Sequence, residues 1–255
     1  MAFRRLKHLF SGSGGPQTAP SPAVPAPPVD LSNLQVSTKP KSPIDLAFEH
    51  SIRDSFEAFR EEMLQALMVP QKGRMRSWCL DRAIAAHGAG GLYLEFGVFR
   101  ADGLNHFARK LAKHDLSITG FDSLQGLSED WTGNHNGREA GSYSVHGKMP
   151  KLEPNAALRD GWVQDTLPGF LEEHGTEKIA FAHLDFDTYT PTAYALEQIR
   201  DRLIPGTVLL FDELYGYPGW RHHEYKALKE TLPDDAYRYL CFSRQSVGIE
   251  IVREM

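Results

Sequence analysis

The sequence contains few of the features that mark secreted, membrane-spanning or nucleic-acid-binding proteins. It has only two cysteines, Cys79 and Cys241, and they have no metal-ligand spacing. Two thiols are too few to staple a fold, so we assign both to packing and expect a cytoplasmic protein. The most apolar run, 208–211, is followed at once by Asp212 and Glu213. It falls far short of the roughly 18 apolar residues that a membrane helix needs.

Concentrated basic charge is also scarce. The formal net charge is −5, whereas a nucleic-acid-binding face needs clustered Lys and Arg to neutralise phosphates. Only residues 1–10 (MAFRRLKHLF) gather basic side chains, and they lack the long apolar core of a secretory signal. We therefore expect no nucleic-acid partner and no transmembrane segment.

The N-terminal part of the chain differs in composition from the rest. Residues 11–43 are dominated by Pro, Ser, Ala and Gly, and such a composition cannot bury enough apolar surface to offset the ordering of the chain. Residues 1–43 are therefore predicted to be a disordered basic and Pro-rich tail. Residues 44–255 are predicted to be one folded domain.

From Asp45 onward, helical and strand-like patterns alternate. Two amphipathic helices, one starting at Asp45 and one at 74–87, come first. They are followed by strands at 92–96, 117–121, 161–164, 179–185 and 207–211, and by helices at 103–113, 167–174, 191–203 and 221–232. Two last strand-like runs, 236–242 and 247–252, flank a short polar turn and predict a hairpin. This order predicts an α/β fold with a Rossmann-like, doubly wound, mostly parallel sheet and a C-terminal antiparallel hairpin.

Ligands of doubly wound sheets bind beyond the carboxyl ends of the strands. The first such end carries Glu95 and Gly97, where the glycine lets the backbone approach a cofactor and the acid can accept from a cationic amino group. The turn lacks the second and third glycines of a dinucleotide fingerprint, which counts against an NAD-linked reductase. The next strand ends in Asp122 and Ser123. Asp122 is expected to hold a ribose diol, and the alternative is that it caps a turn.

Acidic side chains gather at the ends of two later strands. Asp185 and Asp187 follow one strand, and Asp212 and Glu213 follow the next. Parallel strands bring Asp185, Asp212 and Glu213 to one edge of the sheet, where three carboxylates repel unless a cation joins them. Oxygen ligands favour Mg²⁺ or Ca²⁺ over zinc, so the sequence predicts a metal site, with Mg²⁺ as the expected ion. The alternative is that Asp212 or Glu213 pairs with an arginine such as Arg221.

Five sequence blocks carry a family resemblance. They are LEFGVFRADG, GFDSLQGL, GWVQDTLPGF, HLDFDTYTPT and LIPGTVLLFDELYGYPGWRHHEYKAL, in this order between Leu92 and Lys229. Together they resemble the macrocin O-methyltransferase family, class I enzymes that transfer a methyl group from S-adenosylmethionine to a hydroxyl on a sugar of a natural product. Class I methyltransferases also have the doubly wound sheet and terminal hairpin predicted above.

The resemblance implies a role for each strand end. Glu95 and Gly97 would line the methionine end of S-adenosylmethionine, Asp122 with Ser123 would hold the ribose, and the 161–165 segment would close over the adenine. The cofactor-binding residues in that segment would be Trp162 and Asp165. The metal ligands of the family fall on Asp185, Asp212 and Glu213, although the last is Glu where the family resembles an Asp-Asp pair.

Residues 128–160, a long polar stretch, are predicted to form the lid that reads the acceptor. A histidine in this region resembles the general base of the family, because imidazole can take a hydroxyl proton near neutral pH. His135 and His146 are the candidates, with Asp185 as the further catalytic residue, and the choice between the histidines stays open.

The expected function is thus S-adenosylmethionine-dependent, metal-assisted O-methylation of a sugar or natural-product-like small molecule. The alternative is a catalytically idle Rossmann-type binding module that is recruited through its N-terminal tail. The sequence leaves open whether the chain forms a homo-oligomer.

Overall fold

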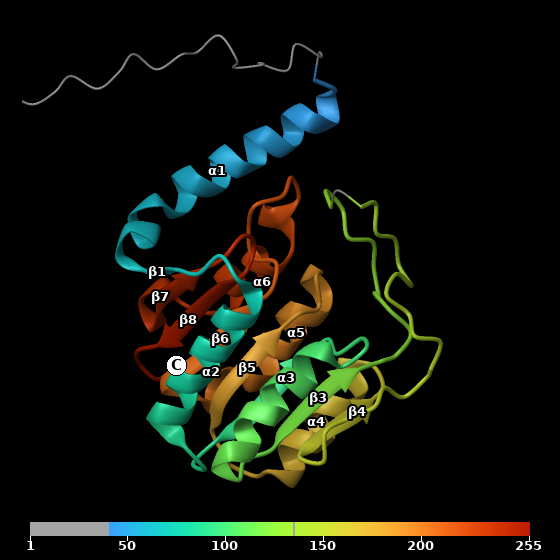
Figure 1. The fold of residues 1–255 in the computed structure, drawn as a ribbon, viewed down its shortest axis with the longest axis vertical. Coiled ribbons are helices and arrows are strands. Elements are labelled where there is room, and N and C mark those ends of the chain that lie inside the picture. The colour runs from blue at the N-terminus through green and yellow to red at the C-terminus, as the bar shows by residue number, and fades with distance from the viewer. Residues whose placement is uncertain (1–40, 135) are drawn as a thin grey trace, which may run out of the picture. The chain divides into compact units, whose positions relative to one another are not determined.

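Helices and strands alternate along the chain in a computed structural model that describes residues 41–134 and 136–255 (Figure 1). The helices are α1 (Pro43–Gln65), α2 (Lys72–His87), α3 (Asp102–Leu111), α4 (Val163–Glu173), α5 (Tyr189–Ile199) and α6 (Glu224–Thr231). The strands are β1 (Leu67–Met68), β2 (Leu92–Phe96), β3 (Ile118–Asp122), β4 (Ala156–Asp160), β5 (Ile179–Leu184), β6 (Leu203–Phe211), β7 (Tyr237–Phe242) and β8 (Val247–Ile251). Short 3₁₀ helices cover Ala112–His114, Arg200–Arg202, Trp220–His222 and Asp234–Ala236. Residues 1–40 of the predicted tail, and His135, lie outside the described residues.

The strands form one sheet with the order β1-β7-β8-β6-β5-β2-β3-β4. Every neighbouring pair is parallel except the two pairs that contain β8, which runs against β6 and β7. The predicted Rossmann-like, doubly wound fold with a C-terminal hairpin is confirmed. The chain builds outward from β2 through β3 to β4 and then returns to β5 on the other side of β2. This reversal of strand order is where doubly wound sheets bind their ligands.

Helices cover both faces of the sheet. Tyr93, Phe181 and Leu210 pack with α2 and α3 on one face, whereas Leu184 and Phe211 pack with α4, α5 and α6 on the other. Because both faces are buried, the central strands β5 and β6 have the near-continuous apolar sequences expected of a covered parallel sheet.

One predicted strand was placed wrongly. The strand expected at 161–164 lies at Ala156–Asp160, and α4 begins at Val163, four residues before the helix predicted at 167–174. Strand β4 lies at the edge of the sheet and pairs only with β3, so it tolerates polar and half-exposed residues such as Arg159. It therefore lacks the continuous apolar run by which a central strand is recognised in a sequence. The two-residue strand β1 was not predicted. The polar connection between β3 and β4 therefore ends at 155, before the predicted end of the lid.

The cysteines and the apolar runs behave as expected within the described residues. Cys79 on α2 and Cys241 on β7 are free, buried thiols with their sulfur atoms 3.4 Å apart. No helix among residues 41–134 and 136–255 is long and apolar enough to span a bilayer.

Candidate functional site

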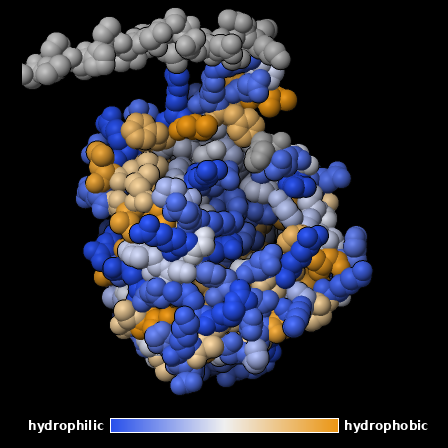
Figure 2. Space-filling model, viewed as in Figure 1, coloured by the Kyte–Doolittle hydropathy of each residue, from blue (hydrophilic) through white to orange (hydrophobic). Residues whose placement is uncertain are grey.

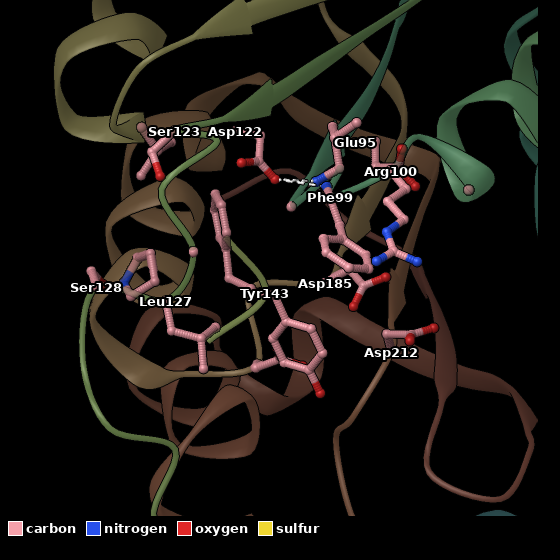
Figure 3. A pocket seen from close by; sticks show the side chains of 18 of the residues that line it. Glu95, Phe99, Arg100, Asp122, Ser123, Leu127, Ser128, Tyr143, Asp185 and Asp212 are labelled. Carbon is pink, nitrogen blue, oxygen red and sulfur yellow. Dashed lines mark hydrogen bonds between the residues drawn. The ribbon is translucent and has the colours of Figure 1, made fainter. Parts of the chain in front are cut away.

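A cavity of about 290 Å³ opens at the carboxyl ends of β2, β3, β5 and β6 (Figure 3). It lies at the point where the strand order reverses. Its wall combines the turn after β2, the turn after β3, the start of α4, the acidic ends of β5 and β6, and two side chains of α2. The charged and aromatic lining residues are Lys72, Arg76, Glu95, Phe99, Arg100, Asp102, Asp122, Tyr143, Trp162, Asp185, Phe186, Asp187, Asp212 and Glu213.

Gly97 is required by the packing of the turn that follows β2. Its φ is +87°, and a Cβ at this position would lie 2.0 Å from the carbonyl oxygen of Asp185. Any side chain would therefore push the turn away from the end of β5. The glycine allows the close contact between two strand ends at the border of the cavity.

Asp122 organises the same turn. Its Oδ2 accepts hydrogen bonds from the backbone N–H groups of Val98 (2.7 Å) and Phe99 (2.8 Å), and its Oδ1 accepts from the N–H of Leu124 (2.6 Å). Figure 3 shows this carboxylate directed at the turn. Asp122 thus fills the turn-capping role that was the alternative in the sequence analysis. It also lines the cavity, and its expected contact with a ribose stays a prediction.

A buried histidine links the ends of β2 and β6. His183 Nδ1 lies 2.8 Å from Glu95 Oε1, and His183 Nε2 lies 3.4 Å from Asp212 Oδ1. All three residues are at most 1% exposed. Burial acts to lower the pKa of His183, but its hydrogen bonds with Asp212 and Glu95 outweigh that effect and raise the pKa. Glu95 keeps one oxygen, Oε2, without a hydrogen-bond partner among the described residues.

Two cations from α2 reach the acidic edge. Lys72 Nζ forms a salt bridge with Asp212 and lies 3.8 Å from Glu213 Oε1. Arg76 Nη2 lies 3.3 Å from both Asp185 Oδ2 and Asp212 Oδ1. The predicted carboxylates therefore do meet at one edge, and part of their charge is balanced by the protein itself.

Those two cations do not neutralise the whole edge. Asp185, Asp187, Asp212 and Glu213 line the cavity, and the buried Glu224 accepts a hydrogen bond from the backbone N–H of Glu213. Burial and the charge of Asp212 raise the pKa of Asp185 to about 6. Burial also raises the pKa values of Asp187 and Glu213, together with the negative charges of their carboxylate neighbours. The carboxylates at this edge of the sheet therefore outnumber the two cations that pair with them.

Asp212 behaves differently from its neighbours. Burial acts to raise its pKa, but the hydrogen bond from His183 and the charges of Arg76 and Lys72 prevail and hold the pKa well below its usual range. Asp212 is consequently the carboxylate of this edge that stays ionised most firmly.

A family model described as a methyltransferase domain matches residues 94–214. This range begins in β2, ends just after β6, and contains every strand end that borders the cavity. Residues 94–214, just under half of the chain, therefore resemble a methyltransferase domain. The chain is similar over 62 residues, at 37% identity, to 8-demethyl-8-(2,3-dimethoxy-alpha-L-rhamnosyl)-tetracenomycin-C 4'-O-methyltransferase of Streptomyces olivaceus. That similarity spans 24% of this chain and 22% of the relative's length.

Solved structures show the same fold. The calicheamicin methyltransferase CalS11 aligns with a TM-score of 0.60 at 22% identity, covering 83% of this chain and 94% of that one. The O-methyltransferase NovP aligns with a TM-score of 0.53 at 16% identity, covering 71% of this chain and 80% of that one. The doubly wound sheet is thus shared with structures of distant sequence.

Most of the predicted site residues border this cavity. They are Glu95, Gly97, Asp122, Ser123, Trp162, Asp185, Asp212 and Glu213. Asp165 is exposed on the first turn of α4, and His146 is exposed in the predicted lid, and neither lines the cavity. Arg221, the predicted alternative partner of the carboxylates, pairs instead with Asp54 of α1 at 2.8 Å. The predicted pairing of Asp212 or Glu213 with Arg221 is therefore wrong. The arginine that pairs with Asp212 is Arg76, and Lys72 pairs with Asp212 as well.

The loop between β3 and β4 supplies an aromatic side of the cavity. Tyr143 lies edge-on to Phe99, with ring centroids 5.6 Å apart, and the Arg138 guanidinium lies 4.8 Å from the centre of the Tyr143 ring. The loop is fixed to the body of the domain by the buried Trp131, whose ring packs edge-on against Tyr217. No role was predicted for Phe99 or Tyr143 from the sequence, because Phe99 is a single aromatic residue in a turn and Tyr143 is one in a polar stretch, and neither belongs to a periodic pattern.

Asp122→Ala is expected to destabilise the domain by about 1–3 kcal/mol, because three backbone N–H groups lose their acceptor and part of this turn is buried. Thermal unfolding followed by circular dichroism measures the change. Ser123→Ala is the matched control, since the Ser123 hydroxyl accepts from one N–H group, that of Gln125. Equal melting temperatures for the two variants would contradict the capping role of Asp122.

Proposed function

We propose that the protein is an S-adenosylmethionine-dependent O-methyltransferase that acts on a hydroxyl of a sugar or of a sugar-bearing, natural-product-like small molecule. The observation that carries this proposal is that the Gly97 turn, Asp122 and the acidic edge of β5 and β6 all face one cavity. The methyltransferase-domain match supports the reaction. The rhamnosyl O-methyltransferase relative and CalS11, described as a TDP-rhamnose 3'-O-methyltransferase, support the acceptor class.

The half of the cavity around β2 and β3 suits the cofactor. Glu95 has a carboxylate oxygen free to accept from the ammonium of the methionine moiety. Asp122 and Ser123 at the end of β3 are available to a ribose diol, and Trp162 at the start of α4 offers an aromatic surface to the adenine. The N-terminus of α3 also faces this space through Asp102 and Gly103.

The half around β5, β6 and the loop suits a polyhydroxylated acceptor. The rings of Phe99 and Tyr143 provide an apolar side for the C–H face of a sugar, and the carboxylates of Asp185 and Asp187 can accept hydrogen bonds from its hydroxyl groups. Pockets for small molecules commonly combine such an apolar wall with a few convergent polar groups. Binding the two substrates in adjacent halves would bring the hydroxyl oxygen and the methyl carbon into contact.

Methyl transfer requires one proton to leave the acceptor. The hydroxyl oxygen forms a bond to the methyl carbon while the bond from that carbon to the sulfonium sulfur breaks, which leaves S-adenosylhomocysteine. We assign the proton acceptor to Asp187. Asp185 and Asp212 are each held by Arg76, and Lys72 lies beside Glu213, whereas no Lys or Arg side chain of the described residues forms a salt bridge with Asp187. Asp187 is also held at a positive φ of 64°, a strained conformation that is frequent at functional sites.

The donor set at the acidic edge fits a divalent metal ion. Asp185, Asp187 and Glu213 offer ligand atoms within 4.8 Å of one another, and so do His183, Asp185 and Asp212. Glu213 Oε2 is buried without a hydrogen-bond partner among the described residues.

Lys72 supports the same interpretation. Its ammonium lies between Asp212 and Glu213, in the place that a metal ion bound by these two carboxylates would take. The Lys72 side chain is 50% exposed, so it has solvent to move into when a metal ion binds. The predicted ligands are divided between the two ligand groups of this edge, which share Asp185: Asp212 belongs to one and Glu213 to the other. We propose that Asp185, Asp212 and Glu213 hold Mg²⁺ once Lys72 is displaced, and the ion would supply Lewis-acid stabilisation of the acceptor oxygen.

Two measurements test this function. Calorimetry should detect binding of S-adenosylhomocysteine to the wild-type protein and weaker binding to Glu95→Gln. Mass spectrometry should detect one added methyl group on a rhamnose-bearing acceptor incubated with the protein and S-adenosylmethionine. Absence of cofactor binding would contradict the proposed reaction. Cofactor binding without transfer to any rhamnosyl compound would contradict the acceptor class alone.

A further inference from the structure

The two cysteines of the chain meet inside the fold. Cys79 of α2 and Cys241 of β7 are 162 positions apart in the sequence, yet their Sγ atoms lie 3.4 Å apart. Both side chains are fully buried, and both thiols are free. The sequence contains no other cysteine, so each thiol has a single possible partner within the molecule.

Gly248 of β8 provides the space in which the two sulfur atoms meet. A Cβ at this position would lie 2.7 Å from Cys79 Sγ and 2.9 Å from Cys241 Sγ. The φ of Gly248 lies outside the left-handed region that favours glycine, so its backbone conformation is open to any residue. The glycine is therefore needed for the two sulfur atoms, and it leaves no side chain between them.

The two thiols differ in acidity. The hydrogen bond with Cys79 lowers the pKa of Cys241 against the effect of burial, and a hydrogen bond from the backbone N–H of Gly248 acts in the same direction. The contact with Cys241 raises the pKa of Cys79, and burial raises it further. Because the thiolate is the form of cysteine that attacks an oxidant, Cys241 is the thiol that reacts first. Cys79 lies in contact with it, where it can resolve the product.

We propose that Cys79 and Cys241 form a modification site, at which a peroxide oxidises the two thiols to an intramolecular disulfide. The Cys241 thiolate attacks one peroxide oxygen, the O–O bond breaks, and Cys241 becomes a sulfenic acid. The Cys79 sulfur then bonds to the Cys241 sulfur, and the sulfenic oxygen leaves as water with the proton of the Cys79 thiol. With hydrogen peroxide as the oxidant, the thiols lose two electrons and two protons in total, and two water molecules form.

The edge of the sheet gives a small oxidant a way in. Strand β1 consists of Leu67 and Met68 alone, and it pairs with β7 at Cys241. Leu67 is 44% and Met68 57% exposed, and Figure 2 shows apolar side chains at the surface where β1 lies in Figure 1. Segments with few buried contacts are the parts of a fold that open most readily. Local opening at this edge admits an oxidant as small as hydrogen peroxide.

The disulfide joins α2 to the C-terminal hairpin. Helix α2 carries Lys72 and Arg76, which pair with Asp212 at the acidic edge, and Arg76 lies one helical turn before Cys79. The bond therefore fixes the helix that supplies both cations to the cavity. It also restricts the unfolded chain over 162 positions, which stabilises the folded state.

Peptide mapping after oxidation of the folded full chain tests the bond. The protein is treated with hydrogen peroxide under native conditions, unfolded, alkylated and digested with trypsin. The expected product is SWCLDR (77–82) joined to YLCFSR (239–244), with neither cysteine alkylated, and dithiothreitol should separate the two peptides. Neither peptide contains methionine, so oxidation of methionines elsewhere does not affect the measurement.

The melting temperature gives a second readout. The oxidised wild-type protein should melt about 5 °C or more above the reduced protein, because the bond closes a long loop. Cys79→Ser and Cys241→Ser keep a polar side chain of similar size and should show no such rise with oxidant. Circular dichroism verifies that both variants are folded.

Four outcomes would overturn the proposal or part of it. Two alkylated cysteines after native oxidation would exclude the modification site, as would sulfinic or sulfonic acid on either peptide without the joined pair. A disulfide between two copies, visible as a dimer on a non-reducing gel, would exclude the intramolecular bond. Joined peptides without a rise in melting temperature would exclude the stabilising link between α2 and the hairpin. None of these measurements depends on the proposed methyl transfer.

Discussion

Asp187→Asn is expected to lower kcat for methyl transfer by about 10³-fold, because the amide cannot take the proton of the acceptor hydroxyl. Asp187 is 8% exposed and lines the cavity, so substrate oxygen can reach it while bulk water is largely excluded. The substitution keeps the size of the side chain and removes its ability to accept a proton. Affinity for S-adenosylhomocysteine should stay within about threefold of wild type, since the cofactor contacts lie on β2 and β3.

Two variants make this result specific. Asp201→Asn removes an exposed carboxylate from a 3₁₀ helix outside the cavity, and it should leave kcat unchanged. His146→Ala should also leave kcat near wild type, because His146 is exposed and does not line the cavity. If His146→Ala loses activity and Asp187→Asn keeps it, the base belongs to the loop histidine that the sequence suggested, and the assignment to Asp187 is wrong.

The fold could be predicted from the sequence because its strongest patterns are determined by burial. Strand β2 was predicted at its observed bounds, and β5 to within one residue. Both are central strands covered on two faces, which forces a continuous apolar run. The edge strand β4 was misplaced because it has a single neighbour and keeps Arg159 half-exposed. The apolar sequence pattern of a strand is therefore weaker where the strand is less buried.

The acidic half of the site could be predicted because topology alone brings it together. The carboxyl ends of parallel neighbours share one edge, so Asp185 and Asp212 had to lie close whatever the details of the loops. Their counter-charges could not be found in this way. Lys72 and Arg76 belong to α2, which precedes the first central strand. In the sequence they cannot be distinguished from the solvent-exposed basic residues of any amphipathic helix.

Gly97 and Asp122 illustrate a different limit. Both were selected as cofactor-binding residues, and both have a packing reason to be present that the sequence does not reveal. The Gly97 backbone lies against the Asp185 carbonyl, and the Asp122 carboxylate accepts from the turn that Gly97 begins. A residue that lines a cavity can therefore be needed first for the shape of that cavity, and substitutions at these positions would combine loss of fold with loss of binding.

Removal of divalent metal by EDTA is expected to lower kcat by about 100-fold or more without abolishing cofactor binding, and added Mg²⁺ should restore it. A direct binding readout is the melting temperature. Mg²⁺ should raise it above about pH 7 and have little effect below about pH 5, because metal and protons compete for the same oxygens. The sign follows from Asp185, whose pKa of about 6 keeps it protonated on the acidic side and available to metal on the alkaline side. Asp212→Ala should remove the Mg²⁺ effect at every pH.

Substitution of Lys72 distinguishes two possible sources of positive charge at the acidic edge, a bound metal ion and the lysine itself. Its ammonium contacts Asp212 and lies beside Glu213, so a bound metal ion must displace it. Lys72→Met should therefore strengthen Mg²⁺ binding, by up to about fivefold if the displaced salt bridge is worth the roughly 1 kcal/mol that a half-exposed pair contributes at most. Arg238→Met, which removes an exposed cation paired with Glu250 at the far hairpin, is the control and should leave Mg²⁺ binding unchanged. The opposite pattern, full turnover in EDTA and loss of turnover in Lys72→Met, would mean that the lysine itself stabilises the acceptor oxygen and that the acidic edge works without metal.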